Sequence, residues 1–319
     1  MKLKEIRPEQ YARQVLPLTA PLWAGRRTFE QYVAQTLEMA AGGYGRRNYR
    51  TIGLYDGAKL VASFKRYERV LRSGSRRLRA VGFGAVFTPP EYRNRGYASV
   101  MLASALDGAR NDGCDVAYLF SDIRPQFYAE LGFRALPSRE LVLRADALPW
   151  QRLPIAALTP DDWTGVRRCF ELTERSRESA FVRSVLVWEW IATRMRHASE
   201  HALGHATNLV VRRGRSVRAY VFGVRVPERD TYDLDEYGFA GDGDAATIPA
   251  LLRAAAGDLR RIAGWLPPEN ARALLPKGTT RRRKRAIFMM MALRAEHEPL
   301  IAAIASAKRG DFCWASDHI

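Results

Sequence analysis

The stretch Arg93-Asn94-Arg95-Gly96-Tyr97-Ala98 has residue types that suit the binding of an anion. It precedes an amphipathic helix, predicted from apolar residues at helical spacing: Ala98, Met101, Leu102, Ala105, Leu106 and Ala109. The first N–H groups of a helix lack partners within it and lie at the positive end of its dipole. Gly96 leaves room beside the backbone, and Arg93 and Arg95 add positive charge. The spacing therefore predicts a phosphate site that suits a diphosphate.

The segment that leads into this turn is Leu78–Thr88, which has apolar or small residues on both faces. That pattern is typical of a central strand covered on each side. Pro89 follows it, and a proline cannot continue a strand ladder. We therefore expect the end of this strand to separate from its neighbour and to leave backbone groups free for an extended ligand.

These elements resemble the GNAT superfamily of N-acetyltransferases. Arg93–Ala98 matches the Q/R-x-x-G-x-G/A signature that holds the pyrophosphate of acetyl-CoA, and Tyr128–Phe133 looks like the family's Y-x-x-x-G-F element. The resemblance covers about residues 1–145. It implies an α/β fold with a mixed, mostly antiparallel sheet flanked by helices. A dinucleotide-binding domain fits less well, because no G-x-G-x-x-G motif is present.

The resemblance also implies roles for single residues. The backbone of Val86, Phe87 and Thr88 is expected to bind the pantetheine arm of acetyl-CoA. The diphosphate is expected at the residues of the signature: Arg93, Asn94, Arg95, Gly96, Tyr97 and Ala98. Tyr128 is similar to the family's general acid, which protonates the sulfur of CoA; the alternative is a core aromatic beside Phe127. No cysteine lies in either motif, which favours direct transfer without a covalent enzyme intermediate.

The general base is less clear from the sequence, because the central strand carries no carboxylate. Asp122 is one candidate, although its setting also suits an ordinary turn or helix cap. Tandem GNAT proteins of the Eis type suggest the other: in them the C-terminal carboxylate is the base, which here is that of Ile319. A tail that is merely docked or frayed is the alternative for Ile319.

The second half of the sequence repeats the approximate order of strands and helices predicted for the first half. We predict a catalytic GNAT domain over residues 1–146 and a degenerate GNAT-like domain with a C-terminal tail over residues 147–319. Where the main helix of the second half begins, the sequence is Gly241-Asp242-Gly243-Asp244. Two carboxylates suit a helix N-terminus but repel a phosphate, so the second domain is not expected to bind CoA. The layout resembles Eis-type proteins without their sterol-carrier-like third domain.

Several charged clusters leave alternatives open. The formal net charge of +17 fits either a solvated basic surface or a polyanionic partner. Arg281–Arg285 is interpreted as a solvated hairpin, with contact to the CoA 3′-phosphate or to an acidic partner as the alternative. An acidic cluster is interpreted either as a site that attracts a cationic amine or as solvated residues of loops and turns. Its members are Glu228, Asp230, Asp233, Asp235, Glu236, Asp242 and Asp244. His197, His201 and His205 lie four residues apart, but no carboxylate completes a zinc set, so no metal is expected.

The sequence thus predicts an N-acetyltransferase that moves an acetyl group from acetyl-CoA to a primary amine of a small molecule or peptide. The alternative is a non-catalytic acyl-CoA sensor, or a basic nucleic-acid-binding protein with the same fold; no nucleic-acid motif favours the latter. No apolar stretch is long enough to cross a membrane, and three scattered cysteines suit a reducing compartment, so a cytoplasmic protein is expected. Homo-oligomerisation is left open.

Overall fold

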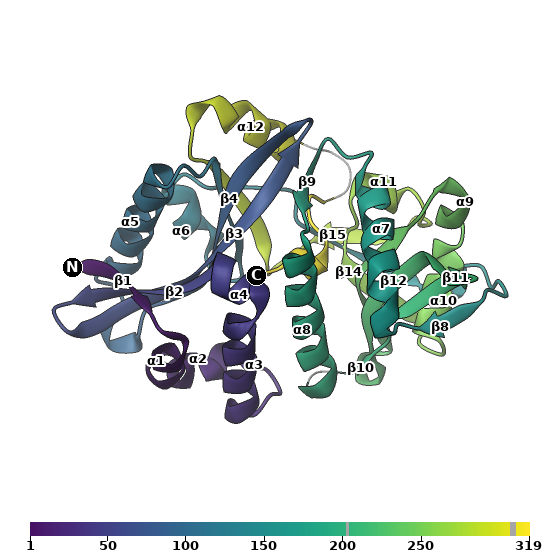
Figure 1. The fold of residues 1–319 in the computed structure, drawn as a ribbon, viewed down its shortest axis with the longest axis horizontal. Coiled ribbons are helices and arrows are strands. Elements are labelled where there is room, and N and C mark those ends of the chain that lie inside the picture. Colours follow the sequence, from purple (N-terminus) through teal and green to yellow (C-terminus); the bar gives the residue numbers. More distant parts are fainter. Residues whose placement is uncertain (202–203, 307–310) are drawn as a thin grey trace.

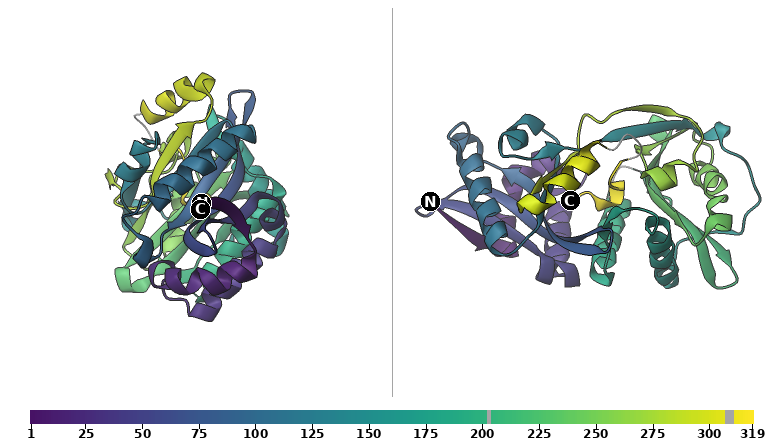
Figure 2. Two further views of the ribbon diagram at one scale, coloured as in Figure 1. Left: turned by 90° about the vertical axis from the view of Figure 1, so that its left-hand side faces the viewer. Right: turned by 90° about the horizontal axis from the view of Figure 1, so that it is seen from above.

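The computed structural model describes residues 1–201, 204–306 and 311–319, and of residues 199–201 the backbone alone. Two α/β lobes lie side by side, each built on a sheet with eight strands among the described residues (Figure 1). The N-terminus is at the outer edge of the first lobe. The last residue lies between the two lobes in both Figure 1 and the right-hand view of Figure 2.

The first sheet contains one parallel pair, β4 with β5, among otherwise antiparallel pairs. Its strands, in spatial order, are β1 (Lys2–Ile6), β2 (Tyr49–Asp56), β3 (Lys59–Ser73), β4 (Arg76–Phe87), β5 (Val116–Ser121), β16 (Ile287–Ala292) and β6 (Arg134–Ala135), with β9 (Ser179–Val182) also beside β3.

The second sheet likewise contains one parallel pair, β13 with β14. Its strands, in spatial order, are β15 (Thr279–Arg282), β7 (Arg139–Arg144), β14 (Arg261–Trp265), β13 (Thr231–Phe239), β12 (Ser216–Val226), β11 (Leu209–Arg213) and β8 (Ile155–Ala157), with β10 (His205–Ala206) also beside β12.

Helices connect and cover the two sheets. Those of the first lobe are α1 (Pro8–Gln14), α2 (Leu16–Trp23), α3 (Phe29–Ala41), α4 (Gly43–Asn48), α5 (Tyr97–Asn111) and α6 (Pro125–Glu130). Those that follow are α7 (Trp163–Glu174), α8 (Val185–His201), α9 (Asp242–Ala245), α10 (Ile248–Ala256), α11 (Glu269–Arg272) and α12 (Glu298–Ser306). The parallel pairs are joined through α5 in one lobe and α10 in the other, so the predicted repeat of a mixed α/β fold is confirmed.

Three strands lie in the sheet of the other half of the chain: β7 in the second sheet, and β9 and β16 in the first. Although β6 and β7 are close in the chain, β6 pairs with β16 whereas β7 pairs with β14 and β15 in the other sheet. The late strand β16 lies between β5 and β6 in the first sheet. The division at residues 146 and 147 stays a prediction, but both sheets use strands from either side of it.

Local signals set several boundaries near the site. Thr28 forms a capping box with Gln31 at the start of α3. The segment from Pro8 to Trp23 forms two helices, α1 and α2, which meet at Val15. Helix α8 begins only at Val185, because residues 179–182 form β9 beside β3.

The amphipathic stripe of α5 packs on one face of the first sheet. Met101, Leu102, Leu106 and Ala109 are buried in a cluster with side chains of β3, β4 and β5. Ala98 lies at the start of the helix and is partly exposed. The buried stripe fixes the direction of α5, and therefore the place of its N-terminus at the end of β4.

Candidate active site

The parallel pairing of β4 with β5 stops early. It runs from Ala80, opposite Val116, to Phe83, opposite Leu119. Beyond Phe83, β4 pairs with β3 alone among the described strands, while β5 continues beside β16. The two strands therefore separate at their ends, and the backbone of residues 84–87 faces the gap.

A β-bulge marks this separation. The register between β3 and β4 shifts between Ser63 and Lys65, and Ala85 has a φ of 47°. A bulge bends its strand and turns side chains toward a new direction. Val86 lines the cavity described below, whereas Phe87 is buried and packs edge-on against Trp23.

The predicted anion site lies just beyond this strand end. Asn94 and Gly96 have φ values of 61° and 75°, and Gly96 is the N-cap of α5. A Cβ added to Gly96 would meet no atom within 4 Å, so the left-handed backbone, rather than crowding, favours glycine there. Arg93 donates from Nε to the carbonyl of Thr88 at 3.2 Å.

The electrostatics of this turn favour an anion. Residues 93–96 are exposed, and the first turn of α5 contains no acidic residue. Val100 donates its N–H to the carbonyl of Gly96, so the N–H groups of the preceding residues in α5 have no partner further back in the helix. The ring of Tyr97 packs on that of Tyr92, over which Arg95 lies at 6.0 Å.

A cavity of about 360 Å³ opens on the other side of the gap between β4 and β5. It brings together residues predicted from distant parts of the chain: Val86, Asp122, Tyr128 and Ile319. Helices α3 and α8 and strand β3 contribute further lining residues, among them Tyr32, Lys65, Tyr67, Trp190 and Arg194. The size suits a small organic molecule.

Tyr128 lies on α6 and is half-buried beside Phe127 and Phe133. Burial and, to a smaller extent, the nearby charge of Asp122 raise the pKa of Tyr128 to about 12. A phenol with such a pKa stays protonated at neutral pH and can donate a proton to a thiolate that forms beside it.

Asp122 lines the same cavity and also has a structural contact. Its Oδ1 accepts a hydrogen bond of 3.0 Å from the backbone N–H of Ala286, which precedes β16. The turn role considered for Asp122 is therefore present in the structure. The carboxylate is exposed, and its other oxygen accepts no hydrogen bond from the described residues, so it can also contact a ligand.

The C-terminal tail, residues 311–319, is docked between the lobes rather than frayed. Ile319 lies over β4: a Cβ added to Gly82 would come within 2.6 Å of its Cδ1, and one added to Gly84 within 3.7 Å of its carbonyl carbon. Two glycines on the central strand thus provide the space for the last residue. Arg194 donates hydrogen bonds to the carbonyls of Ser316 and His318.

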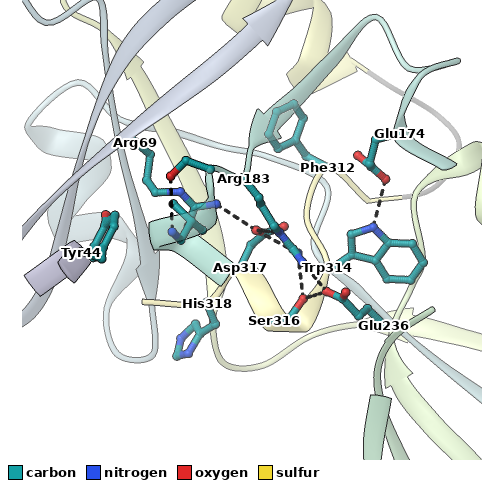
Figure 3. A network of polar contacts seen from close by, with 12 residues as sticks. Tyr44, Arg69, Glu174, Arg183, Glu236, Phe312, Trp314, Ser316, Asp317 and His318 are labelled. Atoms are coloured by element: carbon teal, nitrogen blue, oxygen red, sulfur yellow. Dashed lines mark hydrogen bonds and ion pairs between the residues drawn. The ribbon is translucent and has the colours of Figure 1, made fainter. Parts of the chain in front are cut away.

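A buried polar network anchors this tail (Figure 3). Asp317 accepts hydrogen bonds of 3.1 Å from Arg69 of β3 and from Arg183, which precedes α8. Arg183 also donates to Glu236 of β13 at 2.7 Å and to Ser316 at 2.9 Å. The network joins both sheets to the tail, and the sequence offered no local signal for it.

Charge pairing outweighs burial for the central groups of this network. Burial raises the pKa of Asp317, but Arg183 and Arg69 lower it further, so its pKa lies below the ordinary value. Burial likewise lowers the pKa of Arg183, yet Asp317 and Glu236 raise it above its ordinary value. The tail is thus fixed by fully ionised partners.

His318 is a residue of the site that the sequence reasoning missed. It lines the cavity and packs against the rings of Phe120 and Trp265, at centroid distances of 5.0 and 5.7 Å. Burial, followed by the charge of Arg194, lowers its pKa. The imidazole is therefore neutral near pH 7 and adds no positive charge to the cavity.

The charged clusters singled out in the sequence are largely structural. Arg283 is buried, with its guanidinium 3.6 Å from the ring centroid of Trp265, so the interpretation of this run as a solvated hairpin is wrong at that position. Of the acidic cluster, Glu236 belongs to the tail network and Asp244 pairs with Arg218 at 2.6 Å.

The histidines do not share one helix. His197 is on α8 and contacts Glu38, His205 is on β10, and the side chain of His201 lies outside the described residues. Within the described parts of the chain, no group of three or more metal-binding side chains is found. No helix among the described residues is long and apolar enough to cross a membrane.

The fold and site define a two-lobed α/β protein in which an exposed helix start, preceded by two arginines, lies beside a pair of strands that separate at their ends. Residues 19–136 match the family described as "Acetyltransferase (GNAT) domain". No curated protein matches the sequence.

Solved structures share the fold over 92% of the chain. A probable N-acyltransferase of unknown function from Enterococcus faecalis is 13% identical, with a TM-score of 0.72 over 72% of its length. Eis1 from Mycobacterium abscessus is 12% identical, with a TM-score of 0.60 over 73% of its length. A tandem GNAT protein from the clavulanic acid biosynthesis pathway is 13% identical, with a TM-score of 0.52 over 98% of its length. Residues 19–136 thus match a GNAT acetyltransferase domain, and the chain shares the tandem GNAT fold that its motifs indicated.

Proposed function

We propose that the protein transfers an acetyl group from acetyl-CoA to a primary amine. One observation supports this most strongly: the gap between β4 and β5 connects an exposed helix N-terminus rich in arginine with a cavity that contains a protonated tyrosine. GNAT proteins in general are acyl-CoA-dependent transferases, and the assignment of acetyl-CoA as the donor is part of the proposal.

In this proposal, the free backbone of residues 86–88 binds the pantetheine arm and the start of α5 binds the diphosphate. The amine nitrogen attacks the thioester carbonyl, a C–N bond forms and the C–S bond breaks. Tyr128 donates its proton to the departing sulfur, and the proton of the amine passes to a base. Asp122 and the terminal carboxylate of Ile319 both lie at the cavity and are the candidate bases. The role of Ile319 requires a chain that ends at this residue, which an intact mass measurement checks.

We assign acetyl-CoA binding to the first lobe, that is to residues 1–146 and the strands that complete their sheet. In the second lobe, the main helix α10 begins at Ile248, so the prediction that Gly241–Asp244 lie at its start is wrong by one short helix. These residues form the start of α9, which begins with Asp242 and contains Asp244, and Asp244 pairs with Arg218. Carboxylates at a helix start disfavour a phosphate, which supports a degenerate second domain.

A matched pair of variants at Gly96 tests acetyl-CoA binding. Asparagine and aspartate both tolerate the left-handed backbone, and neither side chain would meet a protein atom within 4 Å of its Cβ. Gly96→Asp places a negative charge at the helix start, so we expect it to bind acetyl-CoA about tenfold or more weakly than Gly96→Asn, as measured by titration calorimetry.

Equal affinities of the two variants would contradict a diphosphate site at α5, and a wild-type protein that binds no acetyl-CoA would overturn the proposed function. Measuring the release of free CoA thiol from acetyl-CoA with a panel of amines then distinguishes an acetyltransferase from a non-catalytic sensor. Binding without turnover on any amine would indicate a non-catalytic acyl-CoA sensor.

A further inference from the structure

The cavity has an excess of positive charge that acyl transfer by itself does not require. Arg27, Lys65 and Arg194 line it, from the segment before α3, from β3 and from α8. Among the described lining residues, the one carboxylate side chain is Asp122. Ile319 adds a second carboxylate when it ends the chain. The imidazole of His318 is neutral.

Lys65 lies on the cavity side of the sheet. It pairs in register with Gly84 of β4, so the two residues share the sheet face over which Ile319 lies. Its Nζ is 5.6 Å from the ring centroid of Tyr11 and 5.9 Å from that of Tyr49. Among the described residues, no carboxylate pairs with this ammonium group, and no hydrogen bond to it is present.

Arg27 has polar contacts but no counter-charge among the described residues. Its Nε donates to the carbonyl of Ala24 at 2.8 Å and its Nη2 to that of Trp23 at 2.7 Å, while Nη1 donates to Gln35. These neutral acceptors fix the guanidinium without neutralising it. Burial and then the charge of Arg27 lower the pKa of Lys65 to about 8, because both disfavour the ammonium form.

Arg194 is different, because Asp235 lies near enough to raise its pKa even though burial lowers it overall. The uncompensated charge is therefore concentrated at Lys65 and Arg27. Two like charges facing a partly buried cavity are costly unless a ligand supplies the opposite charge. A simple cationic amine would increase this cost, whereas an anionic group would remove it.

Given the proposed function, we infer that the acceptor is a zwitterion: an amine that also carries a carboxylate, which Lys65 and Arg27 bind. Its amine would lie toward Asp122 and Tyr128, where the acyl group arrives. Aromatic rings of Tyr32, Tyr67 and Trp190 line the space between these ends and suit an apolar or aromatic body. A volume of about 360 Å³ fits a molecule the size of an amino acid.

The test uses N-acetylated products, because they bind without acetyl-CoA. The probes are N-acetyl derivatives of several amino acids, N-acetylphenylalanine among them, each compared with its neutral carboxamide by titration calorimetry on the full chain. A charged carboxylate bound by Lys65 should bind about ten- to hundredfold more tightly than the carboxamide. Equal affinities, tighter binding of the carboxamides, or no binding of any probe would overturn the inference.

Substitutions of Lys65 identify the group responsible. Lys65→Met keeps the length of the side chain between the two tyrosine rings and should abolish the preference for the carboxylate. Lys65→Arg should retain the preference, and Lys59→Met, at an exposed position of the same strand, should leave it unchanged. A preference that survives in Lys65→Met would contradict the assignment.

The outcome is separable from that of the proposed function. Binding of the carboxylate probes without binding of acetyl-CoA would support the anion site and contradict the proposed acetyltransferase function. Binding of acetyl-CoA without a preference for carboxylates would agree with the proposed function and contradict the zwitterionic acceptor.

Discussion

Three residues at the cavity differ in what their polar groups can contribute to proton transfer. Tyr128 is kept protonated, because burial and the charge of Asp122 raise its pKa to about 12. Asp122 is exposed and already bonded through one oxygen to the backbone of Ala286. Ile319 is placed over the central strand by a fixed tail. The geometry therefore favours Tyr128 as the acid and leaves the two carboxylates to be separated by experiment.

Three variants distinguish these roles. Tyr128→Phe should lower kcat by about 10²- to 10⁴-fold with little change in the KM for acetyl-CoA, because proton donation is lost but binding is not. Removing Ile319 should lower kcat if its carboxylate is the base, whereas Asp122→Asn should lower it if Asp122 is. Since the acid has a pKa of about 12, the wild-type rate should not fall between pH 8 and 10 through loss of the acid. Steady-state kinetics on an accepted amine measure these effects.

Tyr55→Phe is the matched control, because Tyr55 is a half-buried tyrosine of β2 outside the cavity lining. Unchanged kcat in Tyr128→Phe, or an equal loss in Tyr55→Phe, would contradict the role of Tyr128 as the acid.

At the scale of elements, the tail is positioned by charges rather than by regular structure. Its buried residues include Phe312, Cys313 and Trp314, and Trp314 donates from Nε1 to Glu174 at 3.0 Å. Asp317 then joins Arg69 of the first sheet to Arg183 beside the second. A short segment without strand partners thus gains a fixed position from both lobes, and this places its last residue in the cavity.

Asp317→Asn tests this anchoring. It leaves buried Arg69 without a counter-charge and Arg183 with Glu236 alone, so we expect a loss of about 3–5 kcal/mol in the free energy of unfolding at pH 7. The pKa of Asp317 is lowered in the folded protein, so the ionic stabilisation is present above its ordinary value of 3.8 and is lost as pH falls through the folded pKa. The difference between wild type and variant in urea denaturation should therefore shrink below about pH 4.

The exposed pair of Asp146 with Arg144 provides a control. Asp146→Asn should leave the free energy of unfolding almost unchanged, because an exposed ion pair is screened by solvent. A comparably small effect of Asp317→Asn, or a difference that does not depend on pH, would contradict the proposed anchoring.

At the scale of the whole molecule, the exchange of β7 and β16 makes each lobe dependent on the other half of the chain. β16 has β5 on one side and β6 on the other, and its Phe288, Met289 and Met290 are almost completely buried. A fragment of residues 1–146 would lack this strand and would expose the edge of β5.

We therefore expect residues 1–146 alone to show no cooperative unfolding transition, whereas the full chain unfolds in a single transition by circular dichroism and by tryptophan fluorescence. The fragment should also lack the dispersed amide spectrum of a folded protein. A fragment that unfolds cooperatively, or two separate transitions in the full chain, would show that the lobes are independent.

The features predicted correctly from the sequence are those set by neighbouring residues. The stripe of α5 and the turn that ends at Gly96 follow from spacing, side-chain chemistry and backbone freedom within a few positions. These local features were enough to indicate the GNAT fold, because its diphosphate signature lies within one strand, turn and helix.

The tertiary structure alone decided what depends on residues far apart in the chain. Arg283 is stacked on Trp265 rather than solvated, β16 lies in the first sheet, and Asp317 is held by Arg69 and Arg183. The sequence contains no local mark of such pairings, since the energy of a buried contact depends on which surfaces meet in the folded chain. The motif was therefore readable in the sequence, whereas the cavity, its cations and the position of Ile319 came only from the fold.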